Sequence, residues 1–187
     1  MSKVFIGGSR RISRLDAEVR ERLDRILAQE MPVLIGDANG ADKAVQRYLD
    51  ERGYRNVEVF CAGRICRNNV GQWRQRPVSA TRHSKSSFGF YAAKDRAMTQ
   101  EADYGFMVWD GSSGGTLLNV LRLVKQKKKV VVYDARDGSF WDIKHEDLWR
   151  EFVARCDPEV RELLRRRANA ESSEGADELQ RSLLSSA

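Results

Sequence analysis

Short apolar runs alternate with segments of helical periodicity, and this alternation constrains the fold more than any other feature of the sequence. The apolar runs lack the polar alternation of half-exposed strands, which is typical of strands buried on both faces of a parallel sheet. We expect strands at residues 3–6, 32–35, 57–60, 103–108 and 129–133. The sequence therefore predicts an α/β fold with a Rossmann-like, doubly wound, mainly parallel sheet of about five or more strands, with C-terminal helices.

Helices are expected between and after these strands. The first is marked by Leu15, Val19, Leu23 and Leu27, whose four-residue spacing places them on one helical face. Further helices are expected near residues 41–51, 90–100, 115–126, 148–153 and 159–167.

The chain length of 187 residues suits one domain with its own core. We expect a single domain over residues 1–167, with a basic loop insertion at 62–89 that has little regular structure. Residues 168–187 are polar and rich in serine, so we expect this tail to be partly disordered.

Positive charge is concentrated in the predicted insertion. The net charge is +6, and the segment between Cys61 and Ala93 carries six basic residues and no acidic one. The basic residues are Arg64, Arg67, Arg74, Arg76, Arg82 and Lys85. A local cationic segment on a neutral body suggests an anionic partner, and the alternative is a solvated surface loop.

Neither a membrane span nor a metal site is expected. No apolar run approaches the roughly 18 residues that a spanning helix needs, and the N-terminus enters a strand without the pattern of a signal peptide. The three cysteines are an odd number, and Cys61 and Cys66 have no second Cys or His pair that would complete a zinc site. We therefore expect free thiols and a cytoplasmic location.

Glycine and polar residues collect at the carboxyl ends of three predicted strands. The stretches are GGSR at 7–10, GDANGAD at 36–42 and WDGSSGGT at 109–116. Ligands of open parallel sheets bind at this edge, where the strand order reverses, and the amides at a helix start suit phosphate. Neither the GxGxxG fingerprint nor a P-loop is present, so we expect neither NAD hydride transfer nor ordinary ATP hydrolysis.

Several side chains in these loops suit either a ligand or a structural role. The hydroxyls of Ser9 and Thr116 can cap a helix or bind phosphate, and Arg10 suits bidentate binding of a phosphate. Asp42 can bind a ribose or hold the neighbouring loop. Asp110 ends a strand, where it can contact a sugar hydroxyl or act as a base.

In their order and at these strand ends, the stretches GGSR, GDANGAD, KDRAM and WDGSSGGT resemble the SLOG superfamily. The resemblance is to its YspA/YpsA-like branch, which is related to the Lonely guy phosphoribohydrolases and the DNA-processing protein DprA. It covers about residues 3–133 and is specific as a set of motifs, although no single motif is.

The resemblance implies a nucleotide or nucleotide-derived ligand whose phosphate lies against residues 113–116. Its sugar and base would reach toward the first two loops. Asp37 stands where the family often has glycine, and Lys94 replaces the usual arginine. The candidate ligand-binding residues are Gly7, Gly8, Ser9, Arg10, Gly36, Asp37, Gly40, Ala41, Asp42, Arg67, Asn68, Lys94, Asp95, Asp110, Gly111, Ser113, Gly114, Gly115, Thr116 and Asn119.

One departure from the family bears on catalysis. The phosphoribohydrolases carry a glutamate on the helix after the glycine-threonine loop, and this chain has Asn119 at about that place, with no carboxylate from Ser112 to Tyr133. An asparagine cannot act as a general base at neutral pH. The catalytic candidates that remain are Asp95 and Asp110.

Three functions stay open from the sequence. The first is binding or sensing of a nucleotide, and the second is hydrolysis of its N-glycosidic or phosphate bond. The third is single-stranded nucleic-acid binding by the basic segment 62–89, in which Trp73, Phe88 and nearby Tyr91 offer stacking surfaces. Arg67, Asn68, Trp73 and Arg74 are expected to form a lid over the pocket. The resemblance implies a homodimer, whereas the identity of the nucleotide and any role of Mg²⁺ stay open.

Overall fold

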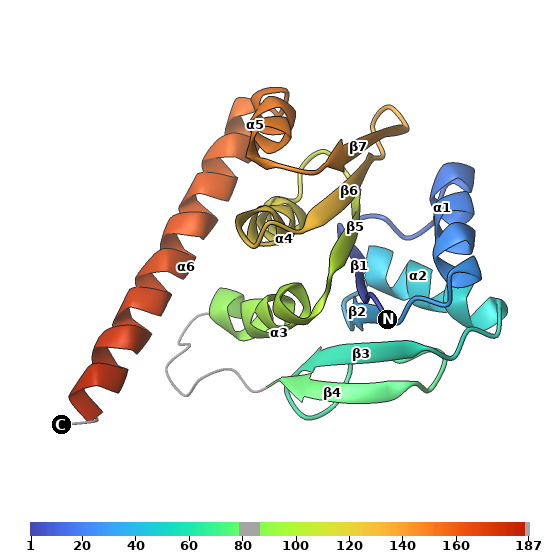
Figure 1. The fold of residues 1–187 in the computed structure, drawn as a ribbon, viewed down its shortest axis with the longest axis horizontal. Coiled ribbons are helices and arrows are strands. Elements are labelled where there is room, and N and C mark those ends of the chain that lie inside the picture. Colours follow the sequence, from blue (N-terminus) through green and yellow to red (C-terminus); the bar gives the residue numbers. More distant parts are fainter. Residues whose placement is uncertain (79–86, 186–187) are drawn as a thin grey trace.

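A seven-stranded sheet forms the centre of the protein in a computed structural model that describes residues 1–78 and 87–185 (Figure 1). The strands lie in the order β4-β3-β2-β1-β5-β6-β7, and all neighbours are parallel except β6 and β7. They are β1 Val4–Gly8, β2 Val33–Gly36, β3 Val57–Ala62, β4 Arg74–Val78, β5 Tyr104–Trp109, β6 Lys129–Asp134 and β7 Ser139–Ile143. This sheet confirms the predicted α/β, Rossmann-like fold.

Helices cover both faces of the sheet. They are α1 Ala17–Ala28, α2 Ala41–Glu51, α3 Ser87–Glu101, α4 Gly114–Lys125, α5 Glu146–Ala154 and α6 Pro158–Ser185. One face carries α1 and α2, and the other carries α3, α4 and α5. Figure 1 shows α6 as a long helix that runs along the outside of the second layer, where it packs on α4.

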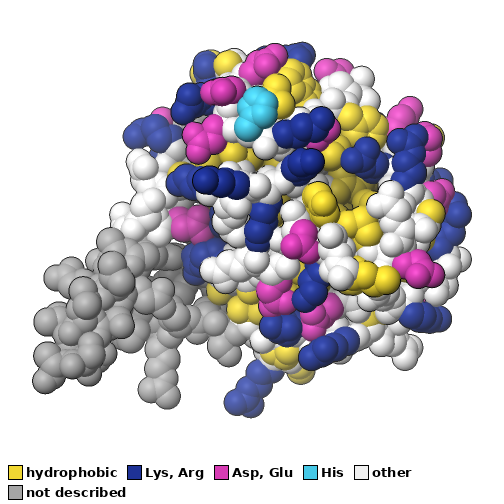
Figure 2. Space-filling view, in the orientation of Figure 1, with side chains coloured by type: hydrophobic (Ala, Val, Ile, Leu, Met, Phe, Trp, Pro, Cys, Tyr) yellow, Lys and Arg dark blue, Asp and Glu magenta, His cyan; other side chains and the backbone are white. Residues whose placement is uncertain are grey.

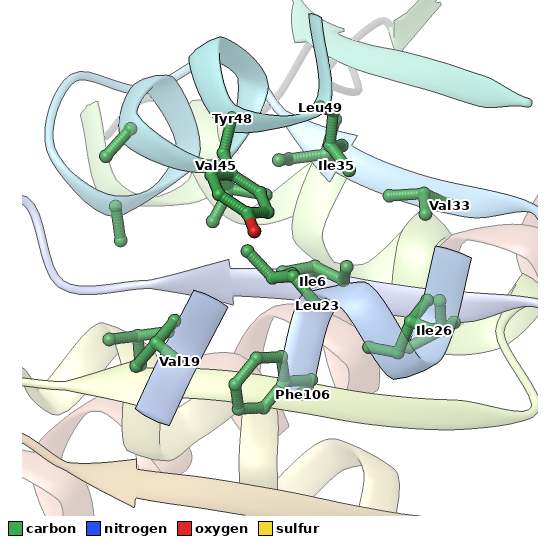
Figure 3. Packing of buried hydrophobic residues seen from close by; sticks show 14 of the residues in the cluster. Ile6, Val19, Leu23, Ile26, Val33, Ile35, Val45, Tyr48, Leu49 and Phe106 are labelled. Carbon is green, nitrogen blue, oxygen red and sulfur yellow. The ribbon is translucent and has the colours of Figure 1, made fainter. Parts of the chain in front are cut away.

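Two apolar clusters form the core, one on each face of the sheet. Alternate residues of a strand point to opposite faces, so Ile6 of β1 packs under α1 and α2 while Phe5 packs under α4. Figure 3 shows Ile6 together with Leu23 of α1 and Phe106 of β5. The burial of strand residues on both faces is what produces the continuous apolar runs in the sequence.

Two strands were not predicted, and each lies at an edge of the sheet. β4 lies within the segment 62–89, so the prediction of an irregular loop is wrong for this part of it, and α3 also begins inside the segment. The sequence of β4 is RQRPV, which is mostly polar because an edge strand is partly solvated. Pro77 is tolerated there because an edge strand needs to donate hydrogen bonds on one side only.

Helix α6 extends beyond residue 168, where the sequence predicted a partly disordered tail. The helix continues from Pro158 through this point to Ser185. Glu171 accepts hydrogen bonds from Arg122 of α4 at 2.7 Å and from Arg96 of α3 at 3.3 Å. These partners lie far away in the sequence, which is why a polar composition alone suggested a tail.

The cysteines also differ from the prediction. Cys61 and Cys66 form a disulfide in the structure, whereas free thiols were expected, and Cys156 is free and buried. Among the described residues no helix is long and apolar enough to span a membrane. Within residues 1–78 and 87–185, no group of three or more His, Cys, Asp or Glu side chains is arranged to hold a metal ion.

Candidate functional site

A cavity of about 450 Å³ lies at the carboxyl edge of the sheet, between β1 and β5. The chain leaves β1 toward β2, β3 and β4 on one side and returns through β5 to β6 and β7 on the other. The cavity therefore lies at the point where the strand order reverses, which is where open α/β sheets bind their ligands.

Many of the sequence-predicted residues line this cavity. They are Gly7, Gly8, Arg10, Asp42, Lys94, Asp95, Asp110, Ser113, Gly114, Gly115, Thr116 and Asn119. The remaining candidates do not appear in its wall, and these are Ser9, Gly36, Asp37, Gly40, Ala41, Arg67, Asn68 and Gly111. The structure thus brings together the loops after β1 and β5 and the middle of α3, whereas most of the loop after β2 does not line the cavity.

Ser9 lies directly behind the cavity wall and joins the ends of β1 and β5. Its backbone amide donates to the carbonyl of Val108 at 2.9 Å, and its hydroxyl accepts from the amide of Asp110 at 3.0 Å. The same hydroxyl lies 3.2 Å from Oγ1 of Thr116. Gly8 is required beside it, because a Cβ there would lie 2.3 Å from the carbonyl oxygen of Val108. These contacts fix the two loops relative to each other.

Asp110 organises the start of α4. Its Oδ1 accepts from the amides of Ser112 at 2.9 Å and Ser113 at 2.8 Å, and Ser113 caps the helix by accepting from the amide of Thr116. Burial raises the pKa of Asp110, but these hydrogen bonds outweigh it and the pKa is lowered overall. The carboxylate is therefore stabilised in its charged form, and this arrangement favours a structural role over that of a base.

The first turn of α4 contributes glycine backbone to the cavity wall. An α-helix leaves its first amides without intrahelical acceptors, and its N-terminus carries a partial positive charge. Gly114 and Gly115 occupy this turn and line the cavity. Backbone without side chains at a helix start is suited to close contact with an oxyanion.

Lys94 of α3 is buried in the cavity wall among three carboxylates. Its Nζ lies 2.9 Å from Oδ1 of Asp95 and 3.9 Å from Oδ1 of Asp37. Asp42 is also close, because a Cβ on Gly36 would lie within 3 Å of both Asp42 Oδ2 and Lys94 Nζ. Burial lowers the pKa of Lys94, but the carboxylates outweigh it, so the pKa is raised and the ammonium stays charged.

Asp42 is the carboxyl group with the most altered acidity in the cavity wall. Its burial raises its pKa to about 6, against the opposing effect of Lys94. It also accepts a hydrogen bond from the amide of Ala38 at 3.2 Å, which holds the loop after β2. Asp42 therefore holds the neighbouring loop, which is one of the two roles that the sequence left open, and its contact with a ribose stays a prediction.

Asp37 and Arg67 form an ion pair behind the cavity wall, and neither residue lines the cavity. The Arg67 guanidinium donates to both carboxylate oxygens of Asp37, at 2.8 and 3.1 Å, and its amide donates at 3.1 Å. Burial raises the pKa of Asp37, but the hydrogen bonds from Arg67 outweigh it and lower the pKa overall. Asn68 adds a hydrogen bond to the carbonyl of Asp37 at 2.8 Å. This pairing joins two loops.

The expected lid is therefore wrong. Neither Arg67 nor Asn68 lines the cavity, and Trp73 is buried in the core cluster under α2. The indole of Trp73 donates to the carbonyl of Tyr54 at 2.9 Å, and Arg74 pairs with Glu58 of the neighbouring strand.

Asn119 is held from both sides by charged side chains. Its Nδ2 donates to Oδ2 of Asp95 at 3.5 Å, and its Oδ1 accepts from Nη1 of Arg122. Arg122 in turn donates to Glu171 of α6 from Nε at 3.0 Å and from Nη2 at 2.7 Å. A continuous polar chain thus runs from the buried Lys94 along the cavity wall to α6.

Arg122, Leu163 and Arg167 line the cavity but were missed by sequence reasoning. The signal for Arg122 was its position as a single charge in the apolar run LLNVLRLV, which indicates a buried and paired arginine. Leu163 and Arg167 come from α6, and nothing near them in the sequence points to the cavity. Arg11 also lines it, at 3.5 Å from Ser112 Oγ.

No protein-family model, curated protein or solved structure matches the chain. The fold and the cavity are therefore established by the structure alone. The resemblance to the SLOG superfamily stays a prediction from the motifs.

Proposed function

We propose that the protein binds a nucleotide or a nucleotide-derived ligand in the cavity at the carboxyl edge of the sheet. The observation that carries the proposal is the position of the glycine start of α4 in the wall of a cavity at the strand-order reversal. Arg10 lines the same cavity. The volume of the cavity lies in the range of small-molecule sites, roughly 300–1,000 Å³. A phosphate would bind to the amides of α4, with the rest of the ligand toward Asp42 and Asp95.

The proposal is for binding because the expected catalytic groups are committed elsewhere. Asp110 is engaged by two backbone amides, and its pKa is lowered. The amide of Asn119 is no base and is held by Asp95 and Arg122. Groups that fix a ligand are thus well represented, and neither Asp110 nor Asn119 is available as a base.

Hydrolysis is the second candidate, and the observation in its favour is the pair of carboxyl groups in the cavity wall. Asp95 and Asp42 both line the cavity, and the pKa of Asp42 is raised to about 6. Incubation with nucleoside monophosphates should then release free base or phosphate, and Asp95→Asn should abolish the release. Turnover that survives this change would exclude Asp95 as the base.

Nucleic-acid binding has less support from the described residues. Three of the basic residues of the segment 62–89 are paired with acids, namely Arg67 with Asp37, Arg74 with Glu58 and Arg76 with Glu101. Figure 2 shows basic and acidic side chains interspersed over the face that carries the N-terminus, without a continuous basic stripe. Residues 79–86, with Arg82 and Lys85, lie outside the described residues, as do the side chains of Phe88 and Tyr91.

Thermal unfolding with a set of ligands tests the binding proposal. AMP and ADP-ribose should raise the unfolding temperature, while adenosine and inorganic phosphate should each have a smaller effect. A ligand at about 100 times its Kd adds about 2.7 kcal/mol, which is a shift of roughly 5–10 °C for a chain of this size. Arg10→Ala should weaken the effect, and Arg14→Ala, an exposed arginine outside the cavity wall, is the control. No stabilisation by any phosphate-bearing ligand would contradict the proposal.

A further inference from the structure

Helix α6 brings an arginine to the cavity, and we propose that this arginine binds the ligand directly. Arg167 and Leu163 line the cavity together with Arg10 and the start of α4. On this proposal, which rests on the proposed nucleotide function, an anionic group of the ligand lies between Arg167, Arg10 and the first amides of α4. The group is a phosphate or a carboxylate, since both are oxyanions that a guanidinium binds through paired hydrogen bonds.

The position of Arg167 against the glycine turn is the geometric basis of the proposal. A Cβ built on Gly115 would lie 2.8 Å from Nη1 of Arg167, and one built on Gly114 would lie 3.5 Å from its Nε. The guanidinium therefore lies over backbone that carries no side chain. An oxyanion at this helix start would be within reach of both the amides and the guanidinium.

The charges at this place favour an anion between them. Burial lowers the pKa of Arg167, and the positive charge of Arg10 lowers it further, so the two guanidinium groups lie close enough to repel each other. The N-terminus of α4 adds a partial positive charge to the same side of the cavity. A negative group placed among the three would form charge-assisted hydrogen bonds with both guanidinium groups.

A second contact of α6 fixes the position of Arg167. Glu171 lies four residues further along, so the two side chains are on the same face of the helix. Glu171 is held by Arg122 through hydrogen bonds of 2.7, 3.0 and 3.1 Å, and by Arg96 at 3.3 Å. Glu171 does not line the cavity, and on this proposal it positions Arg167 by anchoring this part of α6 to α3 and α4.

The experiment measures the affinity for AMP, with inorganic phosphate and acetate as competitors, by isothermal titration of the full chain. Arg167→Ala should weaken AMP binding by roughly tenfold or more, because a charge-assisted pair is lost. Arg167→Lys should give an intermediate loss, since lysine lacks the planar fork. Arg166→Ala is the matched control, because that side chain is exposed and pairs with Glu162. Competition by phosphate but not acetate would identify the anion as a phosphate.

The role of Glu171 is tested by a double-mutant cycle with the same measurement. Glu171→Gln should weaken AMP binding by about threefold or more in the wild-type background and should have little effect when Arg167 is already alanine. A merely structural role would weaken binding equally in both backgrounds. Arg167→Gln replaces the alanine variant if circular dichroism shows that the latter does not fold.

The outcomes separate the two proposals. If the wild type binds AMP and the Arg167 variants bind it within about twofold of wild type, the role of Arg167 is overturned and the proposed function stands. If the wild type binds neither AMP nor phosphate, both proposals fall. Weakening in the Arg167 variants without weakening in Arg166→Ala supports the inference.

Discussion

At the scale of single residues, the buried group formed by Lys94, Asp42 and Asp95 is the most charged part of the cavity wall. Removing one member of a buried ion pair typically costs 3–5 kcal/mol, on the order of a whole domain's margin of stability. Lys94 is the only described cation at this place that pairs with both Asp37 and Asp95. The group is therefore expected to control stability as well as the electrostatics of the ligand site.

Asp42 gives a prediction for the pH dependence of stability. Its pKa in the folded protein is about 6, above the ordinary 3.8, so the folded state holds its proton more tightly than the unfolded state. Its contribution to the free energy of unfolding is fully present below about pH 4 and is lost as the pH rises through 6. Between pH 4 and 7, wild type should lose roughly 2 kcal/mol relative to Asp42→Asn.

Urea denaturation of both proteins at several pH values measures this difference. Asn at position 42 can still accept the hydrogen bond from Ala38, so the loop should keep its conformation. Asp147→Asn is the control, because that side chain is 83% exposed and should leave the pH profile unchanged. A difference that grows in favour of wild type as the pH rises would contradict the raised pKa.

Whether a residue of the site could be predicted from the sequence depends on how far away its partners lie along the chain. Gly8, Ser9, Asp110 and Gly114 could be predicted because a strand end and a helix start mark each of them within a few residues. Arg167 could not be predicted, since its place in the cavity depends on how α6 packs on α4. Asp37 and Arg67 were each predicted to bind the ligand because each alone has a suitable side chain, and their pairing with each other was not foreseen for the same reason.

At the scale of secondary-structure elements, the contact between α4 and α6 rests on the two glycines that begin α4. A Cβ on Gly114 would lie 2.8 Å from Cγ of Leu163, in the middle of a packed side chain. A Cβ on Gly115 would meet the mobile end of Arg167 instead, at 2.8 Å from Nη1. The two positions are neighbours in sequence but face different parts of α6.

This difference predicts unequal effects on stability for two alanine substitutions. Gly114→Ala should destabilise the protein by about 1–3 kcal/mol, because α6 must shift to accept the methyl group. Gly115→Ala should change stability by less than about 1 kcal/mol, since the arginine can move and alanine favours the helix. Gly115→Ala should nevertheless weaken nucleotide binding, because its methyl group occupies the place of the anion. Urea denaturation and titration with AMP check the two effects, and equal stabilities of the variants would contradict the contact.

The strands that are buried on both faces could be predicted from the sequence, whereas the partly exposed ones could not. β1, β2, β5 and β6 are buried on both faces and appear as apolar runs in the sequence. β4 and β7 lie at the sheet edges, where polar residues are allowed, so no such run marks them. The second half of α6 has a polar composition, and its connection to the body depends on Glu171 and on partners that only the tertiary structure brings near.

At the scale of the whole molecule, the site lies between parts of the chain that are far apart in sequence. β1, the loop after β5, α3, α4 and α6 all contribute to the cavity wall, whereas no residue of α1 lines it. A ligand should therefore tie α6 to the body of the protein while leaving the layer of α1 largely unaffected. Local opening of α6 would require release of the ligand, so its opening free energy should rise with ligand concentration.

Amide hydrogen exchange tests this coupling. With AMP at about 100 times its Kd, amide exchange in residues 158–173 and at the start of α4 should slow. The opening free energy should rise by about 2.7 kcal/mol for those openings that expel the ligand. Exchange in α1 through its local openings should not change when AMP is added. In Arg167→Ala, AMP should no longer slow exchange in α6, and exchange in α1 without ligand should be the same as in wild type. Equal slowing in α1 and α6 would show that the ligand stabilises only the global fold, and would contradict a specific connection between the ligand and α6.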